Sequence, residues 1–387
     1  MIPLKKDWSM FKTFSLRKLD FFLILASIAL SLIGVAAIGS AAPALRGRQL
    51  MGVLAGVVIM LAVSTQDYSR ILNLYWLMYI VNIILLLLVL FIGTEHDDAR
   101  RWVQLGPITF QPSELAKLLL ILFFSQFIMK YKEHMKSILM LGILSGLILV
   151  PVYLIYKEPD LSTDIVVILI FAALIFLGGI SIRLVIGFFV ISIPALIIFL
   201  NLVLQEGQTI LKSYQRDRIL AYFHPEDYPD KAYQTLNSIM AIGSGQLLGK
   251  GYNTNEISSL LNSGYISESQ TDFIFTVIGE EFGFVGSCAV VLLIAFICTS
   301  CFITARKAKD TAGMLAAAGI GAWVGFQGII NMGVTTGIIP NTGLPLPFVS
   351  YGLTSLLSLF IGLGIVLNIR MQTVKPRSAV TFRRSGA

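Results

Sequence analysis

Long apolar segments separated by short polar ones dominate the pattern along this chain. An apolar segment of about 20 residues can cross the hydrocarbon core of a bilayer as a helix, whereas the strands of a membrane barrel would alternate and be about half as long. The pattern predicts ten membrane-spanning helices, at residues 20–39, 49–65, 71–92, 113–129, 137–156, 163–179, 183–203, 273–304, 312–334 and 351–369. We therefore expect an all-α integral membrane protein, with residues 1–387 forming a single membrane domain.

The composition supports this prediction. Hydrophobic residues make up 56% of the chain and charged residues only 13%, so polar side chains are too few to cover a soluble protein of this size. The first apolar segment follows a basic stretch, but it is longer than the apolar part of a signal peptide, so we expect it to be retained as a helix. The three cysteines lie in one predicted span without metal or disulfide spacing, and we interpret them as buried small residues: Cys288, Cys298 and Cys301.

Lys and Arg are more frequent in the links on the side of the two termini than in the links on the other side. Because cytoplasmic loops are enriched in these residues, both termini are predicted to be cytoplasmic. Three outer links carry most of the polar variety, at 93–112, 157–162 and 204–272. The last, between helices seven and eight, is too long for a simple connector and is typical of a functional extracellular loop.

Asp272 lies where this long polar segment meets the next apolar one. A carboxylate at that boundary can be held by a helix end and still reach water. Glu280 and Glu281 lie two turns or more deeper, where an unpaired charge is costly. Asp272 is therefore the candidate catalytic residue.

The link at 93–112 leads into the fourth span, for which Ser113 is the predicted N-cap. Glu114 and Lys117 are three residues apart, so they share one helix face and can pair. The pair could be a structural contact that closes the bundle. It could also line a polar cavity in which Lys117 meets an anionic head group, and the sequence leaves both interpretations open.

The link at 157–162 is short and rich in carboxylates. Pro159 ends the preceding helix, and Asp160 or Ser162 can cap the next one. Capping does not account for three acidic residues within seven positions, which are Glu158, Asp160 and Asp164. A further role of Asp160 in hydrogen bonding or cation binding stays open.

Two later segments also carry candidate binding residues. Arg216 and Arg218 lie beside aromatic residues in the long outer loop, where guanidinium groups suit phosphate and sugar contacts. Glycines on both sides of Lys250 permit close backbone approach, but they follow an amphipathic segment and imply no nucleotide fold. Between the last two spans, three prolines at positions 340–347 precede Ser350 and predict a broken or re-entrant segment.

Taken together, these motifs resemble those of the SEDS family (shape, elongation, division and sporulation proteins). In chain order, the resemblance rests on Arg101-Trp102, Gln111–Lys117, Glu158–Leu161, Ala241–Gly245, Thr271–Phe275, Gly279–Glu281 and Gly343–Gly352. Within the family, the chain is more similar to RodA than to FtsW, because Gly249-Lys250-Gly251 follows the Gly-Ser-Gly motif and Asp20 opens the first helix.

The resemblance implies a ten-helix peptidoglycan glycosyltransferase of the bacterial cytoplasmic (inner) membrane that polymerises lipid II at the outer face. It implies a class B penicillin-binding protein transpeptidase and other elongation-complex membrane proteins as partners, and no nucleic acid. The family's essential extracellular aspartate falls on Asp272, its conserved glutamate and lysine fall on Glu114 and Lys117, and its acid before the sixth helix falls on Asp160. The further substrate-binding candidates are Arg101, Arg216, Arg218, Lys250 and Ser350.

The chain departs from the family pattern without losing a carboxylate. Gln270 stands where the family usually has histidine, which excludes a histidine base at that position. The other departures, some of which replace glycines and so affect loop geometry, are Ser162, Asn237, Gln246, Ser267 and Leu353.

A mechanism follows as a hypothesis. Lipid II is an α-linked sugar pyrophosphate and the glycan is β-linked, so one inverting displacement suffices, with Asp272 deprotonating the acceptor hydroxyl. Lys117, Arg101 or the Arg216 and Arg218 pair could stabilise the leaving group. A divalent cation such as Mg²⁺ or Mn²⁺ could bind Asp160, although no ligand spacing indicates one and no cofactor is certain. The alternatives are a transporter that flips the lipid-linked precursor, an FtsW-like division polymerase and a non-catalytic scaffold.

Overall fold

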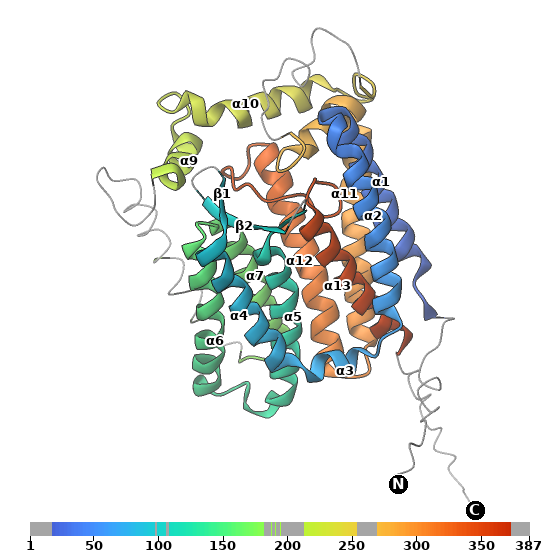
Figure 1. Ribbon diagram of the computed structural model, residues 1–387, viewed down its shortest axis with the longest axis vertical. Helices are drawn as coiled ribbons and strands as arrows, with labels where there is room; N and C mark the ends of the chain where they lie inside the picture. The colour runs from blue at the N-terminus through green and yellow to red at the C-terminus, as the bar shows by residue number, and fades with distance from the viewer. Residues whose placement is uncertain are drawn as a thin grey trace, which may run out of the picture.

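The computed structural model describes residues 18–96, 99–105, 108–181, 187, 190, 194, 213–253 and 269–372. Helices make up most of this part of the chain (Figure 1). They are α1 (Phe21–Ala41), α2 (Pro43–Ser64), α3 (Tyr68–Asn73), α4 (Tyr75–Ile92), α5 (Pro112–Lys130), α6 (Ile138–Lys157), α7 (Leu161–Leu177), α9 (Ser213–Phe223), α10 (Pro229–Ser244), α11 (Ile274–Lys307), α12 (Thr311–Thr335) and α13 (Leu353–Met371). A short 3₁₀ turn, Lys132–His134, connects α5 to α6.

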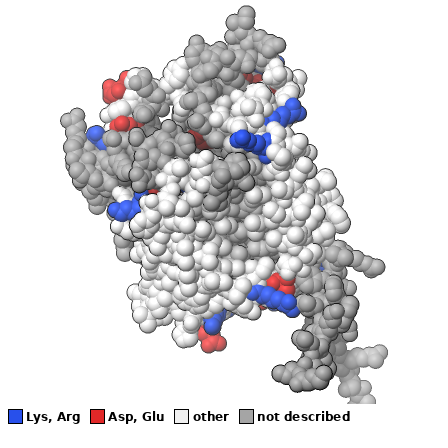
Figure 2. Space-filling view, in the orientation of Figure 1, with Lys and Arg blue, Asp and Glu red and all other residues white. Residues whose placement is uncertain are grey.

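Eight of the described helices are long and apolar enough to cross a membrane, and α7 is a shorter apolar helix of 17 residues. On the face that Figure 2 shows, the charged side chains of the described residues lie toward the two ends, and the surface between them is uncharged, as a bilayer requires. The chain is thus a multi-pass membrane protein. Nine of the ten predicted spans each match one of these helices, and the predicted span at 183–203 lies almost entirely outside the described residues.

Some predicted boundaries are wrong for local reasons. The span predicted from residue 49 begins at Pro43, and the span predicted from 113 begins at Pro112, because proline suits the first position of a helix. Ser113 is therefore not the N-cap, which is Gln111. The span predicted at 71–92 is divided into α3 and α4 at Leu74.

A small sheet lies in the outer link between α4 and α5, which the hydrophobic pattern did not predict. Its antiparallel strands are β1 (Thr94–His96), β2 (Ala99–Leu105) and β3 (Ile108–Phe110), with β2 in the centre. β1 and β3 have three residues each, and the seven residues of β2 do not alternate strictly between apolar and polar side chains, so the pattern carries no strand signal. The sheet places Arg101 on β2, next to the link between α6 and α7.

The bundle has two distinct ends. Helix α10 lies crosswise over one end, while α1 begins and α13 ends at the other (Figure 1). At that other end, Asp20 caps α1 through the backbone N–H of Leu23, as predicted for the opening of the first helix. Asp20 also accepts a hydrogen bond from Ser300 at 2.7 Å and lies 3.4 Å from the Arg370 guanidinium, so it ties α1 to α11 and α13.

Helix α12 lies in the middle of the bundle and contacts α5, α7, α11 and α13. It is rich in Gly and Ala, which lets neighbouring helices approach closely. A Cβ at Gly319 would meet the Ile121 side chain of α5, and one at Gly321 would meet Cys301 of α11. Cys301 is buried and Cys288 and Cys298 are half-buried, and all three are free thiols.

Candidate functional site

Asp272 lies two residues before α11, at the end of the bundle that α10 covers. Its side chain is half-buried, and its Oδ1 accepts a hydrogen bond from Thr271 Oγ1 at 3.1 Å. The N-terminus of a helix favours a negative charge nearby, because the free backbone N–H groups point toward it. The predicted placement of Asp272 at a helix end, between buried and exposed surroundings, is confirmed.

The segment between α12 and α13 lies beside Asp272 and is irregular, as its prolines predicted. Residues 340–352 form no helix, yet Leu344, Leu346, Phe348 and Val349 are buried. Ser350 ties this segment to Asp272's neighbour, because its Oγ donates to the Thr271 carbonyl at 2.5 Å and accepts from Leu346 N at 2.7 Å. The one hydrogen of the Ser350 hydroxyl is used in this contact, and its predicted role in substrate binding stays a prediction.

Gln49, on α2, supports the same segment and was not among the predicted site residues. It is fully buried, and its Nε2 donates to the Ser350 carbonyl at 3.2 Å. The neighbouring Tyr351 N donates to the Gln270 carbonyl at 2.9 Å. The irregular segment is therefore fixed on one side to α2 and on the other to the residues that precede Asp272.

The predicted pairing of Glu114 with Lys117 is confirmed. Lys117 Nζ lies 2.7 Å from Glu114 Oε1, and their side chains are only 0% and 2% exposed. Lys117 Nζ also donates to Gln327 Oε1 at 2.7 Å and lies 5.4 Å from the centre of the Trp323 ring. A buried pair with a neutral hydrogen-bond partner and an aromatic face is well suited to keep its charges inside the bundle.

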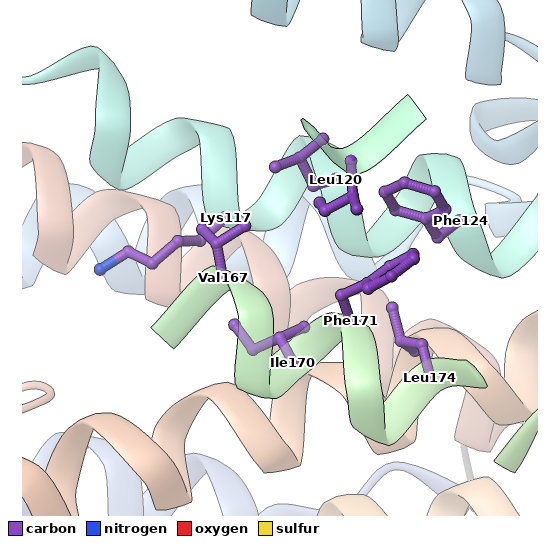
Figure 3. Close-up of a pocket in the computed structure, with 8 residues that line it drawn as sticks. Lys117, Leu120, Phe124, Val167, Ile170, Phe171 and Leu174 are labelled. Atoms are coloured by element: carbon purple, nitrogen blue, oxygen red, sulfur yellow. The ribbon is translucent and has the colours of Figure 1, made fainter. Parts of the chain in front are cut away.

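The stem of Lys117 forms one end of a small apolar cavity between α5, α6 and α7. Figure 3 shows its ammonium pointing away from the cavity's aromatic and aliphatic side chains. The lining residues are Lys117, Leu120, Phe124, Ile148, Val167, Ile170, Phe171 and Leu174. The cavity, of about 10 Å³, has room for about one water molecule. The ammonium of Lys117 lies outside it and binds Glu114 and Gln327 instead.

Asp160 is the N-cap of α7, which confirms one of the two residues predicted for this position, Asp160 or Ser162. Its Oδ1 accepts from Thr163 N at 3.2 Å, and its Oδ2 accepts from Thr163 Oγ1 at 2.9 Å. Ser113 and Gln111 of the α5 start each lie 3.4 Å from Oδ2. Asp160 therefore holds the start of α7 against the start of α5.

Arg101 and Glu158 lie next to this cap. Arg101 donates from a terminal nitrogen to the carbonyl of Pro159, whose φ of 30° is unusual for proline. Glu158 is fully buried, and neither of its carboxylate oxygens has a hydrogen-bond partner among the described residues. Burial is the main cause that raises the pKa of Glu158 to about 9, and the nearby carboxylates of Asp160 and Asp164 add to it. The positive charge of Arg101 acts in the opposite direction and is outweighed. Glu158 is therefore protonated at neutral pH.

Among the residues that the structure describes, Asp160 does not belong to a cluster with the geometry of a metal site. In the described ranges, the three potential ligands that lie close enough to share one ion are His224, Glu226 and Asp227. These side chains are exposed on the turn between α9 and α10, a setting in which acidic groups are common without a metal. Cation binding at Asp160 stays a prediction.

Lys250 is held by a break in α11. At Gly283, φ is 62° and ψ is −157°, so the helical hydrogen-bond ladder is interrupted. The freed N–H groups of Phe284 and Val285 donate to the carbonyls of Gln246 and Leu247, at 2.8 and 3.2 Å. The glycine-containing segment after α10 thus completes the backbone hydrogen bonding of a broken membrane helix, as such helices require.

The same segment neutralises a buried carboxylate. Lys250 Nζ lies 2.9 Å from Glu280 Oε1, and Lys250 N donates to the Glu280 carbonyl at 2.9 Å. The next N–H, of Gly251, donates to the carbonyl of Glu281 at 3.1 Å. Lys250 is thus part of a structural contact, and its predicted role in substrate binding is not tested by this geometry.

Arg216 and Arg218 both lie on α9, which packs against α10. The Arg216 side chain is half-buried, whereas the side chain of Arg218 lies outside the described residues. A substrate-binding role for the two arginines stays a prediction.

Three site residues that the sequence analysis missed lie on α12, spaced by four: Trp323, Gln327 and Asn331. Gln327 Oε1 accepts from Lys117 and from the Trp323 indole N–H, while its Nε2 donates to the Pro345 carbonyl at 2.9 Å. Asn331 Nδ2 donates to the carbonyls of Asp272 and Leu344, at 2.7 Å each. Amides at positions i and i+4 of an otherwise small and apolar span are the signal that could have identified this face.

These contacts define the class of protein. It is a multi-pass membrane protein with a polar network at the end that α10 covers. In this network, one face of α12 and the irregular segment before α13 connect the half-buried carboxylate of Asp272 with the buried pair of Glu114 and Lys117. A family model described as "Cell cycle protein", for FtsW, RodA and SpoVE, matches residues 9–375. The chain belongs to this family, which confirms the predicted membership of the SEDS proteins.

Curated relatives agree with this assignment. The probable peptidoglycan glycosyltransferase FtsW of Nitrosomonas europaea is 37% identical over 300 residues, which cover 75% of this chain and 73% of the relative. The protein of the same name from Pseudoalteromonas translucida is 34% identical, over 76% of this chain and 72% of the relative.

Solved structures resemble the fold over almost the whole chain. A chain from the structure "Structural coordination of polymerization and crosslinking by a peptidoglycan synthase complex" has a TM-score of 0.75 at 29% identity, over 91% of this chain and 97% of that one. The rod shape determining protein RodA of Thermus thermophilus has a TM-score of 0.67 at 27% identity, over 92% and 98%. The similar proteins therefore include both FtsW and RodA.

Proposed function

We propose that this protein is a peptidoglycan glycosyltransferase that polymerises lipid II at the outer face of the bacterial cytoplasmic membrane. The observation that carries the proposal is the polar network in which α12 connects Lys117, through Gln327, with the backbone of Asp272, through Asn331. Relatives that bear the name of this activity support it.

The proposed orientation places both termini in the cytoplasm. The excess of Lys and Arg in the links on that side supports it. The end of the bundle under α10 is then the outer end, where the head group of a membrane-anchored substrate is within reach of Asp272.

In the proposed reaction, the acceptor sugar's 4-hydroxyl oxygen attacks the anomeric carbon of the donor as the bond from that carbon to the pyrophosphate oxygen breaks. Asp272 takes the hydroxyl proton, and the bonding electrons leave with the lipid pyrophosphate. The half-buried position of Asp272 at a helix start keeps a carboxylate that water and substrate can both reach. One base is sufficient for a single inverting displacement.

Lys117 is proposed to stabilise the charge of the leaving group. An ammonium has three N–H donors, and Glu114 and Gln327 use two of them, which leaves one for a phosphate oxygen. Because Lys117 is fully buried, this contact requires the wall of the site to open when substrate binds. Arg101, at the neighbouring outer link, is the second proposed phosphate contact.

The proposed partner is a class B penicillin-binding protein that cross-links the new glycan, within a complex of elongation proteins. The similarity to a chain of a peptidoglycan synthase complex supports a partner of this kind. We propose a role in cell elongation because of Asp20 and of Gly249–Gly251, whereas the FtsW relatives keep a role in division as the alternative.

The test measures glycan formation from labelled lipid II by the purified protein in detergent, with and without its cognate transpeptidase. Wild type is expected to form polymer, and Asp272→Ala and Asp272→Asn are expected to form none. Near-normal polymerisation by Asp272→Asn would contradict the base assignment. Absence of polymer under every condition, with lipid II translocation in liposomes, would instead establish the transporter.

A further inference from the structure

One buried face of α12 contacts both chemical groups of the proposed site. Gln327 and Asn331 are four residues apart, so their side chains lie about 6 Å apart along the helix. Gln327 contacts Lys117 and Pro345, whereas Asn331 contacts Asp272 and Leu344. Adjacent carbonyls of the irregular segment are thus held by adjacent turns of one central helix.

The hydrogen bonds of Asn331 are specific to an amide donor. Its two Nδ2 hydrogens bind two carbonyls from segments far apart in sequence, each at 2.7 Å. Aspartate has the same shape but, as a carboxylate, donates no hydrogen bond, and leucine has no polar group. An uncharged side chain of this size needs an –NH₂ group to donate to both carbonyls at once.

Among the described residues, Asn331 is bound through its donors and not through its acceptor. Asn331 is 1% exposed, and its Oδ1 has no hydrogen-bond partner within the described part of the chain. A buried acceptor without a partner costs about 1–3 kcal/mol. The contacts of this amide in the described part of the chain are therefore its two donor bonds, to the carbonyls of Asp272 and Leu344.

We infer that Asn331 is a positioning residue for Asp272, a role that rests on the proposed function. Its amide fixes the Asp272 backbone to Leu344, and the Thr271 hydroxyl restrains the carboxylate itself. The face of α12 thereby sets the distance between the proton acceptor, Asp272, and the phosphate contact, Lys117. In the proposed reaction, Asp272 must contact the acceptor hydroxyl while Lys117 contacts the leaving pyrophosphate, so this distance has to fit both groups at once.

The experiment compares Asn331→Ala and Asn331→Ser with wild type in the lipid II polymerisation assay. A control for the loss of a buried amide is Asn82→Ala, because Asn82 is fully buried in the membrane helix α4, outside the site, and its amide has no hydrogen-bond partner among the described residues. Asn331→Ala should lower kcat by about 10- to 100-fold, the effect of a displacement of about 1 Å in a reacting group. Its KM for lipid II should stay within about twofold of wild type, because no substrate contact is removed.

Asn331→Ser keeps one hydrogen donor and should retain an intermediate kcat, whereas Asn82→Ala should retain the wild-type kcat. Thermal unfolding in detergent accompanies each assay. The inference is overturned if kcat is unchanged in Asn331→Ala, if KM rises as much as kcat falls, or if Asn82→Ala loses as much activity. It is also overturned if neither Asn331 variant folds, because the residue is then a requirement of the fold.

Failure of this inference is distinguishable from failure of the proposed function. If wild type polymerises lipid II and Asp272→Asn does not, while Asn331→Ala keeps its kcat, only the positioning role is lost. If Asp272→Asn stays active, the base assignment fails, whatever the result for Asn331.

Discussion

The ammonium of Lys117 lies 2.7 Å from the carboxylate of Glu114, one helical turn away on α5, in a place that solvent barely reaches. Two opposite charges inside a membrane protein stay there when they satisfy each other and their remaining hydrogen bonds. The pair is nevertheless attached to Gln327, and through it to the segment beside Asp272. Structural and chemical roles of this pair are therefore separable by mutation.

Removing one member of the pair should leave the other charge buried and alone. We expect Lys117→Met to destabilise the protein by about 3–5 kcal/mol, and Glu114→Gln to act in the same direction. The double variant Glu114→Gln/Lys117→Met should regain most of this stability, because neither charge remains. Thermal unfolding in detergent measures how much stability the double variant regains. In the polymerisation assay, the folded double variant should be inactive. An active double variant would restrict the pair to a structural role.

Glu158 gives a prediction for pH dependence. Its pKa is raised from 4.5 to about 9 by burial and by its carboxylate neighbours, so the folded protein binds a proton there that the unfolded chain releases. The stability that this proton contributes is complete below pH 4.5 and is lost as the pH rises toward about 9. Glu158→Gln should fold and remove this loss, so its thermal midpoint should fall less than that of wild type between neutral and alkaline pH. Parallel pH profiles for the two proteins would contradict the assignment.

Substitutions in the ion pair of Lys250 with Glu280 can distinguish a structural role of Lys250 from a role in substrate binding. Lys250→Met leaves the fully buried Glu280 without its cation and should destabilise the protein by about 3 kcal/mol. Adding Glu280→Gln should restore both the thermal midpoint and the polymerisation rate if Lys250 acts only within the fold. A restored midpoint without a restored rate would instead support the predicted role of Lys250 in substrate binding.

Gly249 and Gly251 offer a matched pair of substitutions in the segment that completes the broken α11. Both have positive φ, of 81° and 96°, so alanine is strained by about 1–2 kcal/mol at either position. A Cβ at Gly249 would also lie 2.1 Å from the Glu281 carbonyl oxygen, whereas a Cβ at Gly251 would meet no described residue within 4 Å. Gly249→Ala should therefore lower the thermal midpoint clearly more than Gly251→Ala. Equal shifts would mean that this close approach is not needed for the fold.

The sequence by itself determined the features that depend on neighbouring residues. Apolar segments of membrane-spanning length predicted nine of the described helices, because a bilayer imposes one length on each crossing. Spacing by three placed Glu114 beside Lys117, and local capping chemistry placed Asp160 at the start of α7. The prolines near residue 345 predicted the irregular segment, since proline cannot continue a helix.

Only the tertiary structure decided which distant residues meet. Asn331 binds a residue 59 positions away, and Gln327 binds one 210 positions away, which no local pattern encodes. The partner of Lys250 likewise depends on the break in α11 and on the segment that covers it. Periodicity shows which face of a helix is buried, but the pairing of faces is set by packing of small residues along α12. The candidate base, Asp272, and the charged pair were therefore readable in the sequence, while their support by α12 came from the packing of the bundle.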